Sequence, residues 1–180
     1  MKKTTKTSNE IKGDGFILRQ PTIKDAKTLA KHANNKNIAK NMFDGFPSPC
    51  TEKDMKSFIV SVGKAGKKQG YTSDLAIVVN GEPVGMIGFS IEKGFKGGIG
   101  YWVGEDYWGM GIVSKVVNLI TDYLFKKHKL ARITAHVYPW NEGSKKVLEK
   151  NGYINEGLLK NYAKKDGKVI DNYQYAKILK

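Results

Sequence analysis

The clearest pattern of hydrophobic and polar positions lies in residues 106–125, which read DYWGMGIVSKVVNLITDYLF. Apolar residues recur there at helical spacing, and polar residues occupy the positions between them. The apolar set is Val113, Val116, Val117, Ile120 and Leu124, and the polar set is Ser114, Lys115, Asn118 and Asp122. The pattern predicts an amphipathic helix that begins at about residue 112 and buries one face.

Capping residues predict further helices. Thr22 and Asp25 have the spacing of a capping box, and the helix they begin is expected to end at about Ala33. Thr51 and Asp54 repeat this spacing before a second helix. The segment NEGSKKVLEKNG, residues 141–152, starts with an asparagine suited to the N-cap and ends with a glycine suited to the position after the C-cap.

Runs of apolar and β-branched residues between these helices predict strands. Asn80-Gly81 is expected to form a hairpin turn, and Asp166-Gly167 is expected to turn the closing hairpin. The expected strands cover 15–20, 73–79, 82–91, 98–103 and 131–138, followed by the two strands of the last hairpin. This order predicts an α/β fold in which helices cover a mixed sheet.

Length and composition indicate one domain. The chain has 180 residues, 40% of them hydrophobic, and we assign 1–14 to a flexible basic tail and 15–180 to the domain. The start lacks the apolar segment of a secretory signal, and no run approaches the ~18 apolar residues of a membrane helix. We therefore expect a cytoplasmic protein without membrane contact.

The cysteine and charge counts narrow the chemistry. Cys50 is the single cysteine, which we interpret as a small buried hydrophobe, and we expect no metal site. The net charge of +14 favours anionic partners such as nucleic acid, the ribosome, acidic peptides or a polyphosphate cofactor. Scattered lysines can also serve solubility alone. Because no recognised RNA-binding motif is present, we do not expect direct nucleic-acid binding.

The turn Gly109-Met110-Gly111 precedes the predicted helix from residue 112. The first backbone N–H groups of a helix lack partners, and glycine lets a ligand approach them closely, so the turn is suited to phosphates. It is not a Walker loop, which needs Gly-Lys-Ser/Thr, and it lacks the third glycine of a dinucleotide fingerprint. The alternative is a tight turn that needs two glycines for its backbone alone.

Two segments taken together favour the phosphate site over the plain turn: IGYWVGEDYWGMGIVSKVVNLITDYLF and ARITAHVYPWNEGSKKVLEKNGYINEG. Their order resembles the two central motifs of the GNAT superfamily of acetyl-CoA-dependent N-acetyltransferases, above all the RimJ/RimL-like branch that acts on ribosomal-protein N-termini. The resemblance extends over 15–180. It implies a mixed, mostly antiparallel sheet of six to seven strands with helices on both faces, and acetyl-CoA as the cosubstrate.

The resemblance also implies cofactor-binding residues. In the family, backbone amides of the glycine turn bind the pyrophosphate, and the preceding strand pairs with the pantetheine arm. A backbone N–H near Val103 would face the thioester oxygen, where a donor stabilises the oxyanion. The implied residues are Tyr101, Trp102, Val103, Trp108, Gly109, Met110, Gly111, Ile112, Val113, Ser114, Asn141 and Ser144.

The catalytic residues are implied in the same way. Many relatives carry a tyrosine at the position of Leu148 that protonates the departing thiolate, and here Ser144 is the expected donor instead. A general base should have a pKa near neutrality. Ala163 stands where some relatives have a glutamate, so Glu105 and Asp106 are the candidate bases. Both acids, like the hydroxyl of Ser144, can also be ordinary surface groups.

The leading hypothesis is an N-acetyltransferase in which a primary amine attacks acetyl-CoA directly in a ternary complex. The expected acceptor is a protein N-terminus, with a polyamine, an aminoglycoside or an amino acid as the alternative. Other classes stay open: a domain that binds acyl-CoA without catalysis, and a basic module that binds RNA. The sequence is compatible with a monomer or a homodimer.

Overall fold

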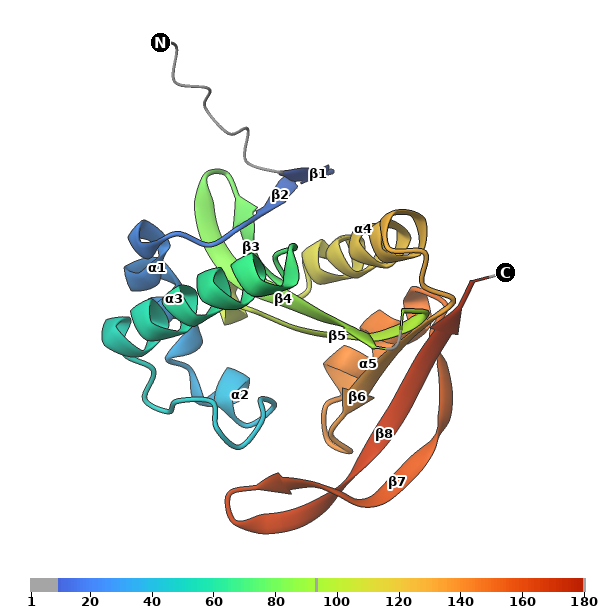
Figure 1. The fold of residues 1–180 in the computed structure, drawn as a ribbon. Helices are drawn as coiled ribbons and strands as arrows, with labels where there is room; N and C mark the ends of the chain where they lie inside the picture. The colour runs from blue at the N-terminus through green and yellow to red at the C-terminus, as the bar shows by residue number, and fades with distance from the viewer. Residues whose placement is uncertain (1–9, 93, 180) are drawn as a thin grey trace.

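The structure is a computed structural model, and it describes residues 10–92 and 94–179. One eight-stranded sheet runs through the described part of the chain in the order β1-β2-β3-β4-β5-β6-β8-β7 (Figure 1). All neighbouring strands pair antiparallel except β5 and β6, which pair parallel. The strands are β1 (Ile11–Gly13), β2 (Phe16–Arg19), β3 (Asp74–Val79), β4 (Glu82–Glu92), β5 (Lys96–Val103), β6 (Arg132–Val137), β7 (Ile154–Lys165) and β8 (Lys168–Ile178).

The helices that begin after Thr22, Thr51 and Asn141 lie where the capping signals place them. The capping box at Thr22 and the one at Thr51 are both formed, with Asp25 and Asp54 as their acidic partners. The short helices are η1 (Ile23–Asp25), α2 (Lys36–Ala39) and η2 (Glu105–Tyr107), and the longer ones are α1 (Ala26–Ala33), α3 (Glu52–Gln69), α4 (Ile112–Lys127) and α5 (Glu142–Lys150). The predicted α/β fold is confirmed.

The first strand corrects the predicted domain boundary. Residues 11–13, which the sequence analysis assigns to a tail, form β1 and pair with β2 across a turn in which Gly15 has φ 82°. Asp14 in this turn accepts a hydrogen bond of 2.6 Å from Lys115 on α4. The short hairpin explains why the sheet has eight strands rather than six to seven. Residues 1–9 of the predicted tail lie outside the described residues.

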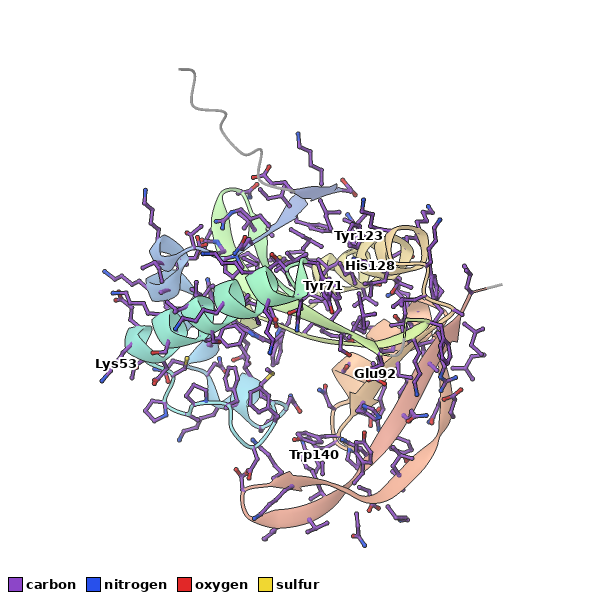
Figure 2. The ribbon with its side chains drawn as sticks, in the orientation of Figure 1. Lys53, Tyr71, Glu92, Tyr123, His128 and Trp140 are labelled. Carbon is purple, nitrogen blue, oxygen red and sulfur yellow. The ribbon has the colours of Figure 1, made fainter. Side chains whose placement is uncertain are left out.

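Helices cover both faces of the sheet (Figure 1). On one face, α1 and α3 pack with Met86 of β4 and Trp102 of β5. On the other face, the apolar side of α4 predicted from the sequence is buried against the sheet, together with Leu148 of α5. His128 packs edge-on against Tyr71 and Tyr123, and Figure 2 shows these three side chains gathered where α4 ends. No helix among the described residues combines the length and apolar character needed to span a membrane.

The sheet divides between β5 and β6. The two strands pair only from Lys96 to Gly98 on β5, opposite Arg132 to Thr134 on β6. Beyond that point β5 continues along β4, while β6 continues along β8. The two halves of the sheet therefore diverge, and the second half of β5 has an edge without a strand partner among the described residues.

Candidate active site

The open edge of β5 carries the backbone donor expected from the sequence. The N–H of Gly104 donates to the carbonyl of Val84 on β4 (2.8 Å). Because successive N–H groups of an extended strand point to opposite edges, the N–H of Val103 points away from β4, toward the gap between β5 and β6. A ligand in that gap can accept this hydrogen bond.

The N-terminus of α4 lies next to this edge. Gly111 is the N-cap with φ 75°, and no side chain of the described residues caps the helix. Gly109 also has a positive φ of 76°, and a Cβ at either glycine would meet no atom within 4 Å. The space beside the two glycines is therefore open, and no side chain of the described residues occupies the N-terminus of α4, as an anion site requires.

A cavity of about 570 Å³, which we call the α4 cavity, joins these two features. It is lined by β5, the turn before α4 and the first turns of α4 and α5. Eleven of the twelve predicted cofactor-binding residues line it: Tyr101, Trp102, Val103, Trp108, Gly109, Gly111, Ile112, Val113, Ser114, Asn141 and Ser144. Met110 does not line it, and its side chain is exposed. A backbone amide can still act at position 110.

Asn141 has the N-cap role that the sequence predicts, and Ser144 lies in the first turn of the helix that it caps. Oδ1 of Asn141 accepts from the N–H of Ser144 (3.1 Å), which makes Asn141 the N-cap of α5. The hydroxyl of Ser144 shares a hydrogen bond of 2.9 Å with the phenol of Tyr101 on β5. Burial raises the pKa of Tyr101, so this phenol is neutral and can donate. Sequence reasoning missed this pairing, because 43 positions separate the two residues.

A second polar cluster fixes the turn before α4. His32 of α1 lies 2.9 Å from Glu82 of β4, and the phenol of Tyr107 donates to the same carboxylate (3.3 Å). His32 also packs against Gly104, where a Cβ would lie 2.6 Å from Nδ1. The indole N–H of Trp108 donates to the carbonyl of Val103 (3.0 Å). These contacts hold the turn against the end of β5.

The two predicted bases lie apart from the cavity. Glu105 accepts hydrogen bonds from Asn35 (2.5 Å) and Asn37 (2.9 Å), which connects η2 to α2. Asp106 is exposed. Neither residue lines the α4 cavity or the larger cavity beside it, and their catalytic role stays a prediction.

Sequence reasoning also missed three lysines. Lys40, Lys146 and Lys150 line the α4 cavity. A scattered lysine carries no local signal of its function, and here the packing of α5 and the segment after α2 brings these three to one rim. Their charges make the cavity suitable for a ligand with several phosphates.

A larger cavity of about 700 Å³, the α3 cavity, lies beside the first. Its walls come from β3, β4, β5, β6, β8, α3 and the loop before α3, including Phe43 and Phe46. Cys50 lines it and is buried, as predicted. His136 lines it as well, stacked on Tyr162 and 3.3 Å from Gln174. The two cavities share six lining residues: Asn41, Met42, Tyr101, Trp102, Asn141 and Ser144.

Comparison with known proteins assigns the class. The family model for the acetyltransferase (GNAT) domain matches residues 16–154, so the chain belongs to the GNAT acetyltransferase family. The uncharacterised N-acetyltransferase p20 of Bacillus licheniformis is 30% identical over 164 residues, which cover 89% of this chain and 91% of that protein. The protein is an N-acetyltransferase.

Two further matches are named as ribosomal-protein acetyltransferases. The ribosomal-protein-serine acetyltransferase of Escherichia coli (strain K12) is 31% identical over 114 residues, 62% of this chain and 64% of that protein. The structure of RimL, a ribosomal L7/L12 alpha-N-protein acetyltransferase in complex with coenzyme A, has a TM-score of 0.84 at 20% identity. The match covers 95% of this chain and 98% of that one, and it shows the common fold.

Proposed function

We propose that the protein transfers an acetyl group from acetyl-CoA to a primary amine by direct attack, without a covalent enzyme intermediate. The observation that carries the proposal is the junction of the two cavities at Tyr101, Asn141 and Ser144. A thioester held in the α4 cavity and an amine held in the α3 cavity would meet there. Attack in a ternary complex needs this proximity of the two reacting groups.

The residues of the α4 cavity fit coenzyme A. The open N-terminus of α4 suits a pyrophosphate, and the three rim lysines suit its further phosphate. The edge of β5 offers backbone groups to the amides of a pantetheine arm. Acetyl-CoA, when bound, supplies the acetyl group as a thioester.

Three groups of the chain then have distinct roles. The N–H of Val103 polarises the thioester carbonyl and stabilises the negative charge that develops on its oxygen. The hydroxyl of Ser144 protonates the departing sulfur. The phenol of Tyr101, 2.9 Å from Ser144, orients that hydroxyl and replaces its proton.

A protein N-terminus is the first candidate for the acceptor. Support comes from the RimJ/RimL-like relatives, which are named for ribosomal-protein substrates. A small amine is the second candidate, because the α3 cavity, at about 700 Å³, has the size of a small-molecule site.

The test begins with calorimetric titration of the protein with acetyl-CoA. A free-thiol release assay then compares peptides that begin with serine or alanine, matched peptides with a blocked N-terminus, and a panel of polyamines, aminoglycosides and amino acids. We expect cofactor binding, and thiol release only with the free-amine peptides. Release with a small amine alone would transfer the assignment to that class. Absence of acetyl-CoA binding, or binding of RNA without thiol release, would overturn the proposal.

A further inference from the structure

The α3 cavity contains one acid, Asp74, that caps no helix and pairs with no cation of the described residues. Asp74 begins β3 and lines the cavity, half-buried. Its carboxylate accepts a hydrogen bond from the hydroxyl of Ser73 (2.8 Å), and no lysine or arginine of the described residues forms an ion pair with it. A carboxylate in this position lacks the cation that usually compensates burial.

Two glycines open a path from Asp74 toward β5. Asp74 pairs with Gly88 on β4, and Gly88 pairs with Gly100 on β5, so the three positions form one row across the sheet. A Cβ at Gly88 would lie 2.7 Å from Oδ1 of Asp74, which shows that the carboxylate leans over the backbone of β4. Gly100 adds no side chain to this row, and Tyr101 of the cavity junction follows it. The carboxylate therefore lies over β4, the strand next to β5.

Two buried amide oxygens line the same cavity. Oδ1 of Asn172 on β8, a residue only 6% exposed, accepts no hydrogen bond from the described residues. Oδ1 of Asn41 also accepts no hydrogen bond from the described residues. The orientation of this amide is set by its Nδ2, which donates to the carbonyl of Asn37 (3.0 Å). Buried acceptors of this kind call for a donor. The N–H groups of a bound acceptor can supply such donors.

The other titratable groups that line the cavity either contact other side chains or stay neutral. Asp54 of α3 accepts from Thr51 in the capping box, and His136 is stacked on Tyr162. Burial raises the pKa of Cys50 and of the phenols Tyr101 and Tyr138, so these groups stay neutral. The titratable groups that face Asp74 across the cavity are therefore Cys50, Asp54, Tyr101, His136 and Tyr138.

We propose that the Asp74 carboxylate binds the ammonium group of the acceptor and is the general base of the reaction, and that the amide oxygens of Asn41 and Asn172 accept hydrogen bonds from other parts of the acceptor. This inference rests on the proposed function. It places the base on β3 rather than at Glu105 or Asp106.

The proton balance is complete with the groups already described. The ammonium gives one proton to Asp74, and the free electron pair on nitrogen forms the new C–N bond as the C–S bond breaks. Ser144 gives its proton to the sulfur, Tyr101 replaces that proton, and the second nitrogen proton returns to the phenol of Tyr101. Asp74 later releases its proton to solvent. Burial raises the pKa of Asp74, and the hydrogen bond from Ser73 lowers this pKa by a smaller amount. The net effect brings the carboxyl closer to the neutral range that suits a general base.

The first test is Asp74→Asn, which keeps the shape and removes the charge. We expect acetyl-CoA affinity to change less than about twofold, and kcat/KM for a serine-initiated peptide to fall by about 10²-fold or more. Asp122→Asn is the matched control, because Asp122 is a partly buried acid of α4 that lines neither cavity. Wild-type turnover in Asp74→Asn would overturn the proposal.

Two more variants separate a base from a structural carboxylate. Ser73→Ala removes the donor that lowers the pKa of Asp74, so the acid limb of kcat/KM should move to higher pH. Gly88→Ala adds a methyl group against Oδ1 and should lower kcat/KM without changing acetyl-CoA affinity. An unmoved acid limb in Ser73→Ala would also overturn the role of Asp74. The proposed function fails separately, if the wild-type protein binds acetyl-CoA and acetylates no amine.

Discussion

At the scale of single residues, the hydrogen bond between Tyr101 and Ser144 is the central contact of the site. It joins a strand of the sheet to the first turn of α5, at the junction of the two cavities. Two hydroxyls in contact can pass a proton on, whereas a lone serine hydroxyl depends on solvent for its replacement. We therefore treat the two side chains as one functional unit.

Removing either hydroxyl should have the same consequence. We expect Ser144→Ala and Tyr101→Phe each to lower kcat by about 10²-fold with little change in acetyl-CoA affinity. Because the two groups act together, the double variant should lose hardly more than either single one, which a double-mutant cycle measures.

Tyr153→Phe is the matched control for this cycle. The phenol of Tyr153 forms a hydrogen bond of 2.8 Å with the hydroxyl of Thr121, and Tyr153 lines neither cavity. The substitution should therefore lower the free energy of unfolding by about 1 kcal/mol and leave the activity unchanged. Strictly additive losses in the cycle would contradict the paired role of Tyr101 and Ser144.

Single residues differ in how well the sequence predicts them. Asn141 was predictable as an N-cap, because a cap is defined by neighbours in the chain. The family resemblance singled out Ser144, which lines both cavities, and its catalytic role stays a prediction. Asp74 was not, because its isolation from cations and its path across Gly88 and Gly100 arise from strand pairing.

At the scale of elements, the start of α4 depends on the backbone of Gly111. An alanine there would occupy the left-handed region at a cost of about 1–2 kcal/mol, and its methyl group would project into the space beside the helix N-terminus. We expect Gly111→Ala to weaken acetyl-CoA binding by about tenfold, measured by calorimetry. Gly70→Ala is the control, because Gly70 has φ 79° and equally open surroundings at the end of α3. Equal loss of affinity in both variants would contradict the phosphate role.

The final hairpin is tied to β6 by a pair whose strength depends on pH. Arg132 donates to both carboxylate oxygens of Glu156 on β7, and Gln174 donates to one of them (3.0 Å). The Arg132 guanidinium, with a smaller contribution from Gln174, lowers the pKa of Glu156 from 4.5 to about 2. A lowered pKa in the folded state means that the stabilisation is complete above the unfolded value and is lost as the pH falls toward about 2.

Glu156→Gln should therefore reduce the free energy of unfolding at pH 7, and the difference from wild type should shrink between pH 4.5 and about 2. Urea titrations at several pH values measure this. Glu92→Gln is the control, because its ion pair with Lys96 is exposed and 3.9 Å long, and such pairs contribute little. A difference that persists below pH 2 would contradict the ionic cause.

At the scale of the whole molecule, the net charge of +14 acts on an anionic cofactor. Lys146→Ala and Lys150→Ala remove charge from the rim of the α4 cavity. Each substitution should lower the affinity for coenzyme A by up to about fivefold at low salt. The loss should be smaller at high salt, because salt screens exposed charges.

The control pair Lys67→Ala and Lys68→Ala, at the end of α3, carries the same change in net charge and lines neither cavity. It should leave the affinity nearly unchanged, in calorimetry at two ionic strengths. Equal effects of both pairs would mean that the field of the whole protein, rather than the rim, attracts the cofactor.

By itself, the sequence determined most of the elements and their order. The amphipathic face of α4, the capping boxes at Thr22 and Thr51, and the turns at Asn80-Gly81 and Asp166-Gly167 all lie where the sequence predicts them. These features depend on residues within a few positions of one another, so local propensity and spacing are enough to specify them. The eighth strand was missed because β1 is three residues long and gains its stability only from pairing with β2.

Only the tertiary structure decided how the site is assembled. Divergence of β5 from β6 opens the edge at Val103, and α5 brings Ser144 to Tyr101. The same divergence leaves the two cavities in contact, with Asp74 facing one of them from β3. These relations join residues tens of positions apart, and packing of the whole core sets them, so no local pattern in the chain can specify them.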